Sequence, residues 1–87
     1  MEKYLFISDP GHGWLRVSKE EVKPIKDKIS SYSYMDRNYV YLEEDCDAGE
    51  FLIHKFGSFD KAKPHIEEKH EENTNIRNYP CFDPTYI

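Results

Sequence analysis

The sequence has no long apolar run and few cysteines, and each scarcity removes a class of protein. None of its 87 residues lies in a stretch of about 18 apolar residues, the length that a membrane-spanning helix requires. The apolar run at residues 4–7 is also too short for the hydrophobic region of a signal peptide. The two cysteines, Cys46 and Cys81, are too few for the disulfide framework of small secreted domains. We therefore expect a cytoplasmic protein with free thiols and no membrane association.

Basic residues are scarce relative to acidic ones, and the imbalance is uneven along the chain. The formal net charge is −5, and from Ile29 onward there are twelve acidic residues and six basic ones. Proteins that bind nucleic acid directly gain much of their affinity by neutralising phosphates. This distribution makes direct nucleic-acid binding an unfavourable hypothesis. It suits a partner with a basic surface, although an ordinary solvated acidic surface is the more common explanation.

Motifs for metal binding and catalysis are also missing. The cysteines and the four histidines form no C-x-x-C or H-x-x-x-H pair, the spacings that mark common zinc sites. His65 and His70 are five residues apart, which suits neither one face of a helix nor one face of a strand. Nothing in its neighbourhood marks Cys46 as an activated nucleophile. We predict a protein that is not an enzyme and has no catalytic residues, no metal site and no cofactor.

The first third of the chain has the pattern of a β-hairpin followed by a short helix. Residues 4–7 and 14–17 are two β-prone runs, separated by a turn rich in glycine and proline. Ser18 lies three residues before Glu21, which is the spacing of a helix capping box. Pro24 cannot donate a backbone hydrogen bond inside a helix. The helix is therefore predicted to break near this residue.

A second hairpin and a second helix follow. Residues 29–35 and 39–42 are β-prone and flank a short polar connection. Asp45 or Asp47 could then cap a helix, and Gly57 is placed to end it. We predict an α+β protein with a small antiparallel sheet of two hairpins and two short helices on one face of the sheet.

The last part of the chain leaves alternatives open. The composition of residues 61–72 favours a helix, but Ile66 is its only large apolar residue, so a charged fifth strand at the sheet edge fits as well. The predicted order is β-β-α-β-β-α, with this fifth strand as an optional last element. Residues 73–87 have the composition of an irregular aromatic tail, and residues 1–87 are predicted to form a single domain.

Side-chain alternation sorts the predicted strands into two faces. The aliphatic face, which we expect the helices to cover, contains Leu5, Ile7, Leu15, Val17, Val40 and Leu42. The opposite face is mainly aromatic and contains Tyr4, Phe6, Trp14, Arg16, Tyr32, Tyr34, Tyr39 and Tyr41. This aromatic face could bind a flat ligand or a protein, be buried in a homodimer, or be covered by the tail through Tyr79, Phe82 and Tyr86.

The turn at residues 9–13 adjoins the predicted aromatic face, and a small ligand would bind best where the two meet. Its glycines could present backbone N–H groups to an anion, although an ordinary hairpin turn is the simpler interpretation. A nucleotide-like molecule is the ligand class that such a junction suits. The candidate binding residues are His12, Trp14, Arg16, Tyr32, Tyr34, Tyr39, Tyr41 and Arg77.

Carboxylates gather where the second hairpin gives way to the second helix. They are Glu43, Glu44, Asp45, Asp47 and Glu50. Their spacing does not match an EF-hand loop, and acidic residues are favoured near a helix N-terminus because its N–H groups are unpaired. They also form a candidate acidic interaction surface, which could imitate nucleic-acid phosphates.

Three motifs resemble a family of small proteins carried by tailed bacteriophages and prophages. They are DPGHGWLRV at residues 9–17, DKISSYSY at residues 27–34 and YLEEDCDAG at residues 41–49, and IRNY at residues 76–79 is similar to an element near the end of those proteins. The resemblance carries no functional residues over. It implies a phage protein, acting in the host cytoplasm, of the kind that binds and inhibits host machinery, including defence systems.

These observations give two functional hypotheses. The first is a non-enzymatic protein that engages a host or phage macromolecule, most simply a protein, through the acidic helix start and the aromatic sheet face. The alternative is a small-ligand binding or sequestering protein for a nucleotide-like molecule.

Overall fold

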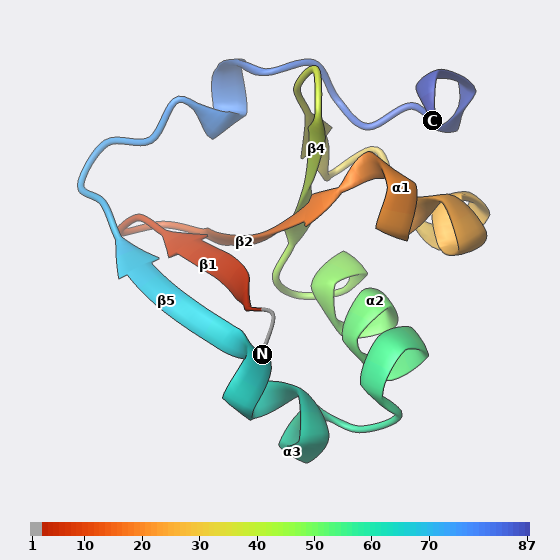
Figure 1. The fold of residues 1–87 in the computed structure, drawn as a ribbon. Helices are drawn as coiled ribbons and strands as arrows, with labels where there is room; N and C mark the ends of the chain where they lie inside the picture. The colour runs from red at the N-terminus through yellow and green to blue at the C-terminus, as the bar shows by residue number, and fades with distance from the viewer. Residues whose placement is uncertain (1–2) are drawn as a thin grey trace.

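Five strands form one sheet in the computed structural model, which describes residues 3–87 (Figure 1). The strands are β1 Tyr4–Ser8, β2 Gly13–Ser18, β3 Tyr34–Met35, β4 Tyr39–Glu43 and β5 Ile66–His70. The helices are α1 Lys19–Val22, α2 Asp47–Phe56 and α3 Phe59–Ala62, and 3-10 helices cover Lys23–Lys28, Lys63–His65, Ile76–Asn78 and Pro84–Tyr86. The predicted α+β class and its two hairpins are confirmed. The predicted start of the domain at residue 1 lies outside the described residues.

Residues 61–72, for which a helix and an edge strand were both open alternatives, contain helix and strand. Residues 61–62 end α3, a 3-10 turn follows, and β5 is the predicted edge strand. The strand order is β3-β4-β2-β1-β5, and β5 runs parallel to β1. A parallel neighbour needs a crossover connection, which α2 and α3 supply between β4 and β5. The sheet is therefore mixed, whereas we predicted an antiparallel one.

The first helix begins and breaks where the sequence predicts. Ser18 is its N-cap, and its side-chain oxygen accepts a hydrogen bond from the backbone N–H of Glu21 at 3.3 Å. The helix gives way to the 3-10 helix Lys23–Lys28, in which Pro24 occupies the first turn. Proline is tolerated there because a first-turn N–H has no intrahelical partner.

The second helix ends as predicted but begins differently. Gly57 is its C-cap with φ of +87°, a left-handed conformation that favours glycine. The N-cap residue is Cys46, and no side chain caps this end. The prediction that Asp45 or Asp47 caps α2 is therefore wrong. Asp47 is the first residue of the helix, and its side chain turns into the protein.

The main core lies between the sheet and the helices, and it corrects the sorting of β1. Residues that lie opposite each other in neighbouring strands share a face, and Phe6 is opposite Leu15 while Ile7 is opposite Trp14. Tyr4 is buried in the main core and Phe6 packs against it, whereas Ile7 packs with the aromatic residues. The predicted faces of β1 were therefore exchanged, because a strand shifted by one residue presents every side chain to the opposite face.

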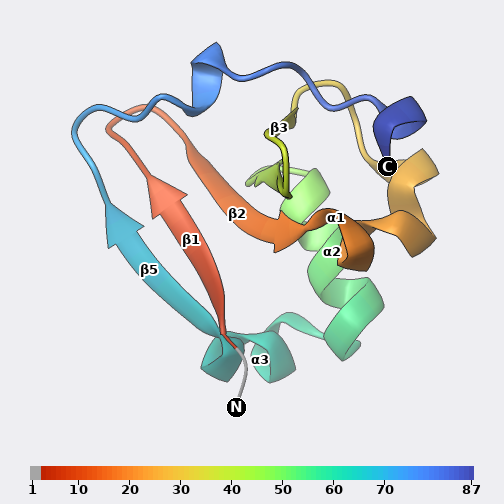
Figure 2. The same ribbon diagram turned by 45° about the horizontal axis from the view of Figure 1, so that its top comes forward.

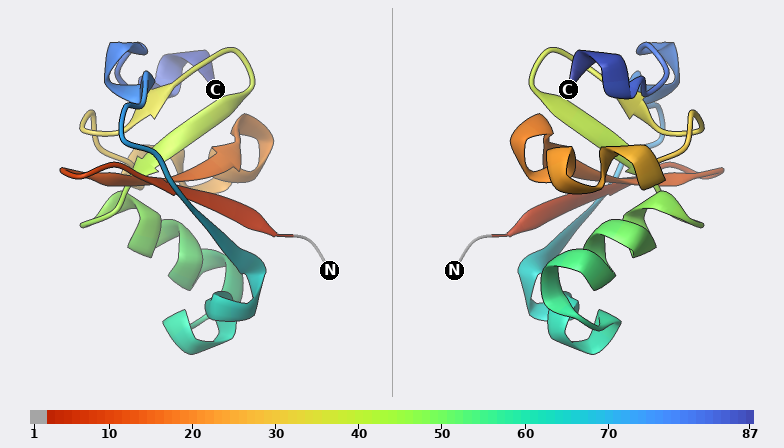
Figure 3. Two further views of the ribbon diagram at one scale, coloured as in Figure 1. Left: turned by 90° about the vertical axis from the view of Figure 1, so that its left-hand side faces the viewer. Right: turned by 90° about the vertical axis from the view of Figure 1, so that its right-hand side faces the viewer.

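The C-terminal tail crosses the sheet on the side opposite α2 and α3 (Figure 3). Ile76 and Tyr79 in the tail pack with Trp14 and Tyr41 in a second, smaller core. Phe82 joins the main core instead, and Tyr86 is exposed. The interpretation that the tail covers the aromatic face is confirmed for the part of the tail that contains Ile76 and Tyr79.

Candidate functional site

The turn between β1 and β2 is held by a buried carboxylate that also fixes the tail. Asp9 Oδ1 accepts hydrogen bonds from the backbone N–H groups of Gly11 at 2.9 Å and His12 at 2.8 Å. Arg77 in the tail donates to both oxygens of the same carboxylate, at 2.9 Å and 3.2 Å. Burial raises the pKa of Asp9, but the hydrogen bonds from His12, Gly11 and Arg77 outweigh it and lower the pKa to about 2.

Arg77 and His12 together cover the indole of Trp14. The guanidinium of Arg77 lies 5.2 Å from the indole centroid. The imidazole of His12 stacks on the indole, and the centroids of the two rings are 6.0 Å apart. Arg77 Nη2 also lies 2.7 Å from His12 Nδ1. Only 1% of the Trp14 surface is exposed. This indole therefore cannot stack on a ligand unless the tail moves.

A small cavity of about 150 Å³ lies beside this cluster. Its lining residues are His12, Trp14, Tyr32, Tyr34, Glu43, Asp45 and Arg77. The structure therefore brings the turn, Trp14, two of the candidate tyrosines and Arg77 together at one cavity. The cavity is smaller than the roughly 300 Å³ at the lower end of usual ligand pockets, so it has room for little more than one small ring.

The other predicted binding residues lie elsewhere. The guanidinium of Arg16 lies 4.6 Å from the centroid of the Tyr39 ring, and the pair lines a separate hollow with Tyr4. Tyr41 is buried and donates a hydrogen bond to Asp36 Oδ2 at 2.6 Å. Burial and this hydrogen bond raise the pKa of the Tyr41 phenol. Tyr41 is therefore a structural residue and not an exposed binding residue, which corrects the prediction.

The carboxylates of the predicted acidic surface also differ in position: some are exposed, and others have structural roles. Asp47 is only 2% exposed, so the prediction that it belongs to an interaction surface is wrong. The side chain of Glu43 accepts a hydrogen bond from the backbone N–H of Cys46 at 2.8 Å and so helps to fix the turn before α2. Glu44, Asp45 and Glu50 are exposed. These three carboxylates remain available to a partner.

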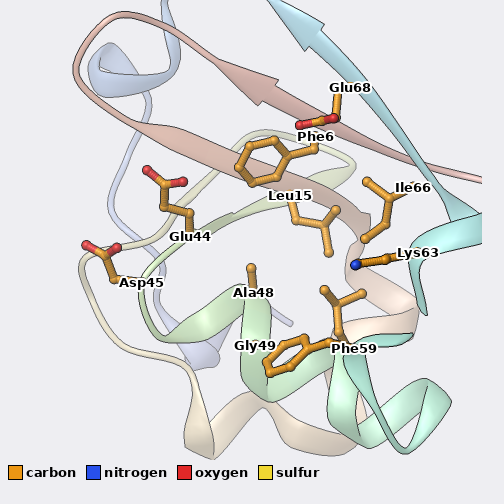
Figure 4. A pocket seen from close by; sticks show the side chains of 11 residues that line it. Phe6, Leu15, Glu44, Asp45, Ala48, Gly49, Phe59, Lys63, Ile66 and Glu68 are labelled. Carbon is orange, nitrogen blue, oxygen red and sulfur yellow. The ribbon is translucent and has the colours of Figure 1, made fainter. Parts of the chain in front are cut away.

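A groove of about 560 Å³ lies between the sheet and the helices α2 and α3 (Figure 4). Its lining residues are Phe6, Leu15, Glu44, Asp45, Ala48, Gly49, Leu52, Phe59, Lys63, Ile66 and Glu68. Figure 4 shows the ring of Phe59 facing Phe6 and Ile66 across the groove, with Glu44 and Asp45 at one end. We call this feature the acid-rimmed groove. Its volume falls in the range of about 300 to 1,000 Å³ that is usual for binding pockets.

Two details of the sequence build this groove, and both were missed. Ser58 caps α3 by accepting a hydrogen bond from the backbone N–H of Lys61 at 3.2 Å, so a new helix begins directly after Gly57 and carries Phe59. The signal was a serine three residues before Lys61 and directly after a helix-ending glycine. Gly13 allows the ring of Phe6 to approach, because a Cβ there would lie 2.5 Å from that ring.

Within residues 3–87, no group of three or more histidine, cysteine, aspartate or glutamate side chains is placed to hold a metal ion. Cys46 and Cys81 are free thiols and both are exposed. Among the helices that the structure describes, none combines the length and apolar character needed to cross a membrane.

The fold and the site define a small α+β protein with an acid-rimmed groove on one side of its sheet and a clamped tail on the other. Comparisons with protein-family models, with curated proteins and with solved structures find no match for the chain. The resemblance to small tailed-phage proteins therefore stays a prediction.

Proposed function

We propose that the protein is a non-enzymatic binding protein that engages a partner protein through the acid-rimmed groove. The observation that carries the proposal is the exposed aromatic ring of Phe59 at the apolar lining of this groove. Phe59 is 56% exposed although its ring faces an apolar floor. Large exposed aromatic rings beside a hydrophobic hollow are typical of binding sites, because an incoming side chain can complete their burial.

The groove replaces the aromatic sheet face as the interaction surface. Trp14 and Tyr41 are buried beneath the tail, so they cannot contribute contact area to a partner while the tail is docked. The acidic helix start keeps its proposed role, since Glu44 and Asp45 line one end of the groove. The partner surface that fits has an apolar side chain next to one or more lysine or arginine residues.

The proposed biological setting follows from the resemblance to phage proteins. The protein would act in the host cytoplasm on a host or phage macromolecule and inhibit it by occupying its surface, and a host defence component is one such target. A binder of this kind needs a preformed surface, and the acid-rimmed groove supplies one.

The test is capture of a cross-linked partner from bacterial lysate with matched variants. We expect Phe59→Ala combined with Glu44→Lys to lose the partner, because both changes remove contacts of the groove with its ligand. Ile53→Ala is the control, since Ile53 is an exposed apolar residue of α2 that does not line the groove. Circular dichroism should show that all variants remain folded. A partner retained by the double variant would overturn the proposal.

A second candidate function is small-ligand binding in the cavity beside Arg77. The specific observation in its favour is that His12, Tyr32 and Arg77 come from separate segments and line one cavity. Glu43 and Asp45 also line it, and Asp9 already neutralises Arg77. This charge pattern favours the nucleobase of a nucleotide-like ligand over its phosphates.

A thermal-shift comparison of nucleosides with their phosphorylated forms tests this candidate. A ligand at 100 times its dissociation constant stabilises the folded state by about 2.7 kcal/mol, which is easily measured. We expect nucleosides to raise the melting temperature more than nucleotides do, and Tyr32→Ala to remove the shift. A panel with no shift would eliminate this candidate.

A further inference from the structure

The two edge strands of the sheet differ in whether another segment hydrogen-bonds to their outer side. At the β3 edge the tail supplies backbone partners: Met35 N–H donates to the carbonyl of Pro80 at 3.0 Å, and Phe82 N–H donates to the carbonyl of Ser33 at 2.7 Å. In the described part of the chain, β5 is the terminal strand on the other side and pairs with β1 alone (Figure 2). An open edge of this kind can accept a further strand.

The direction of the backbone groups of β5 can be assigned from one hydrogen bond. The N–H of Glu71, directly after β5, donates to the carbonyl of Ser8 in β1 at 2.7 Å. Backbone groups point alternately to the two sides of a strand, so the N–H group of Lys69 also points toward β1. The N–H groups of Glu68 and His70 therefore point outward, away from the sheet.

The open edge borders the acid-rimmed groove. Ile66 and Glu68 line the groove, and they lie opposite Tyr4 and Phe6 in the parallel pair. Side chains alternate along any strand added to β5, so every second side chain would point to the face that carries Ile66 and Glu68. An added strand could therefore place an apolar side chain against Phe59 without any change of the sheet.

The charge of the edge restricts which strand can pair with it. Glu67 and Glu68 point to opposite faces of β5, and the single lysine of the strand, Lys69, is paired with Glu71 at 2.9 Å. Symmetric antiparallel pairing with a second copy of the chain is unfavourable when it is centred on Glu67, Glu68 or Lys69, because identical charges then lie opposite each other. A strand with lysine or arginine residues meets favourable charges on both faces.

We infer that β5 receives an extended, lysine- or arginine-rich segment of a partner protein as a sixth strand, with an apolar side chain of that segment seated in the acid-rimmed groove. The inference rests on the proposed function and adds the conformation and the charge of the ligand. Backbone hydrogen bonds to Glu68 and His70 would provide affinity, and the groove and the glutamates would provide selectivity.

The probe is a displayed library of random linear peptides selected on the intact protein. We expect the enriched peptides to combine basic residues with an apolar or aromatic residue at alternating positions. On binding, amide hydrogen exchange at Glu68 and His70 should slow by about tenfold or more, because outward N–H groups become hydrogen-bonded. Glu68→Pro removes one outward donor at a position where an edge strand tolerates proline, and it should weaken binding by about tenfold.

Glu68→Gln is the matched variant, since it removes the charge but keeps the backbone donor. It should retain more affinity than Glu68→Pro. Basic peptides that perturb Phe59 without slowing exchange at Glu68 and His70 would overturn strand addition and leave the groove proposal standing. Selected peptides without basic residues would also overturn this inference, and an absence of any binder at the groove would overturn both. Protection of the same amides without peptide, together with a doubled mass by light scattering, would assign the edge to a homodimer instead.

Discussion

Ser33 donates its hydroxyl hydrogen to Asp47 Oδ2 at 2.5 Å, and both residues are buried. Ser30 donates to the same oxygen from its hydroxyl at 2.6 Å and from its backbone N–H at 3.1 Å. The oxygen of Ser33 in turn accepts a hydrogen bond from the backbone N–H of Glu43 at 3.0 Å. One carboxylate thus ties the loop before β3 to the first residue of α2 and, through Ser33, to the end of β4.

Replacing this carboxylate should destabilise the protein. Asp47→Ala leaves the donors of Ser30 and Ser33 without their acceptor, and the loss of such charge-assisted hydrogen bonds costs about 1.5 to 3 kcal/mol of unfolding free energy. Urea denaturation measures the change. Asp45→Ala is the control, since Asp45 is exposed and such surface changes usually stay within about 0.5 kcal/mol. Equal stabilities of the two variants would contradict the structural role of Asp47.

The fold features that could be predicted are those with a local cause. A serine cap three residues before Glu21, a proline at position 24 and a glycine at position 57 each act through the backbone of their own segment. The inward turn of Asp47 depends on Ser30 and Ser33, which lie far from it in the sequence. No local pattern contains that information.

The exchanged faces of β1 have a different cause. Apolar side chains lie on both faces of this strand, so alternation along residues 4–7 does not say which face meets the helices. Only the pairing of Phe6 with Leu15 decides it.

The candidate site was partly predictable for a similar reason. The sequence placed His12 beside Trp14 because the turn adjoins the strand, and it offered Arg16 or Arg77 as the basic residue at that junction. The structure brings Arg77 into contact with the pair. The sequence offered coverage of Trp14 by the tail only as one of several alternatives, because the choice depends on where the tail docks. The acid-rimmed groove escaped prediction because its shape depends on how α3 and β5 pack against α2 and the sheet, and that arrangement is set by tertiary contacts.

The stability of the protein should depend on the ionisation of Asp9 in acid. The folded-state pKa of Asp9 is lowered to about 2, whereas an unfolded aspartate has a pKa of about 3.9. The ionised carboxylate therefore stabilises the folded state above the unfolded pKa, and this contribution is lost as pH falls from about 4 toward 2. Unfolding free energy measured against pH should fall less steeply across this interval in Asp9→Asn. An identical slope in the two proteins would contradict the role assigned to Asp9.

Arg77 holds the tail against Asp9 and Trp14, and we call this contact the clamp. It can be followed by tryptophan fluorescence, because Trp14 is the only tryptophan. Arg77→Ala removes the guanidinium that covers the indole and binds Asp9. We expect the emission of Trp14 to shift to longer wavelength and acrylamide quenching to increase, since the indole becomes exposed to water. Arg37→Ala is the control, because Arg37 is an exposed arginine outside the clamp. Unchanged quenching in Arg77→Ala would show that the tail stays docked without this residue.

Replacing the two glycines of α2 and its C-cap by alanine should change the stability of the protein in opposite directions. Gly57 has φ of +87°, a conformation that costs alanine roughly 1 kcal/mol, so Gly57→Ala should lower the unfolding free energy. Gly49 lies in α2, and a Cβ there would meet the ring of Phe59 at 3.5 Å, which is ordinary contact. Gly49→Ala should therefore raise the unfolding free energy by about 0.5 to 1 kcal/mol through helix propensity. Each variant serves as the control for the other in urea denaturation. A loss of stability in Gly49→Ala would mean that the groove is packed more tightly against Phe59 than its geometry indicates.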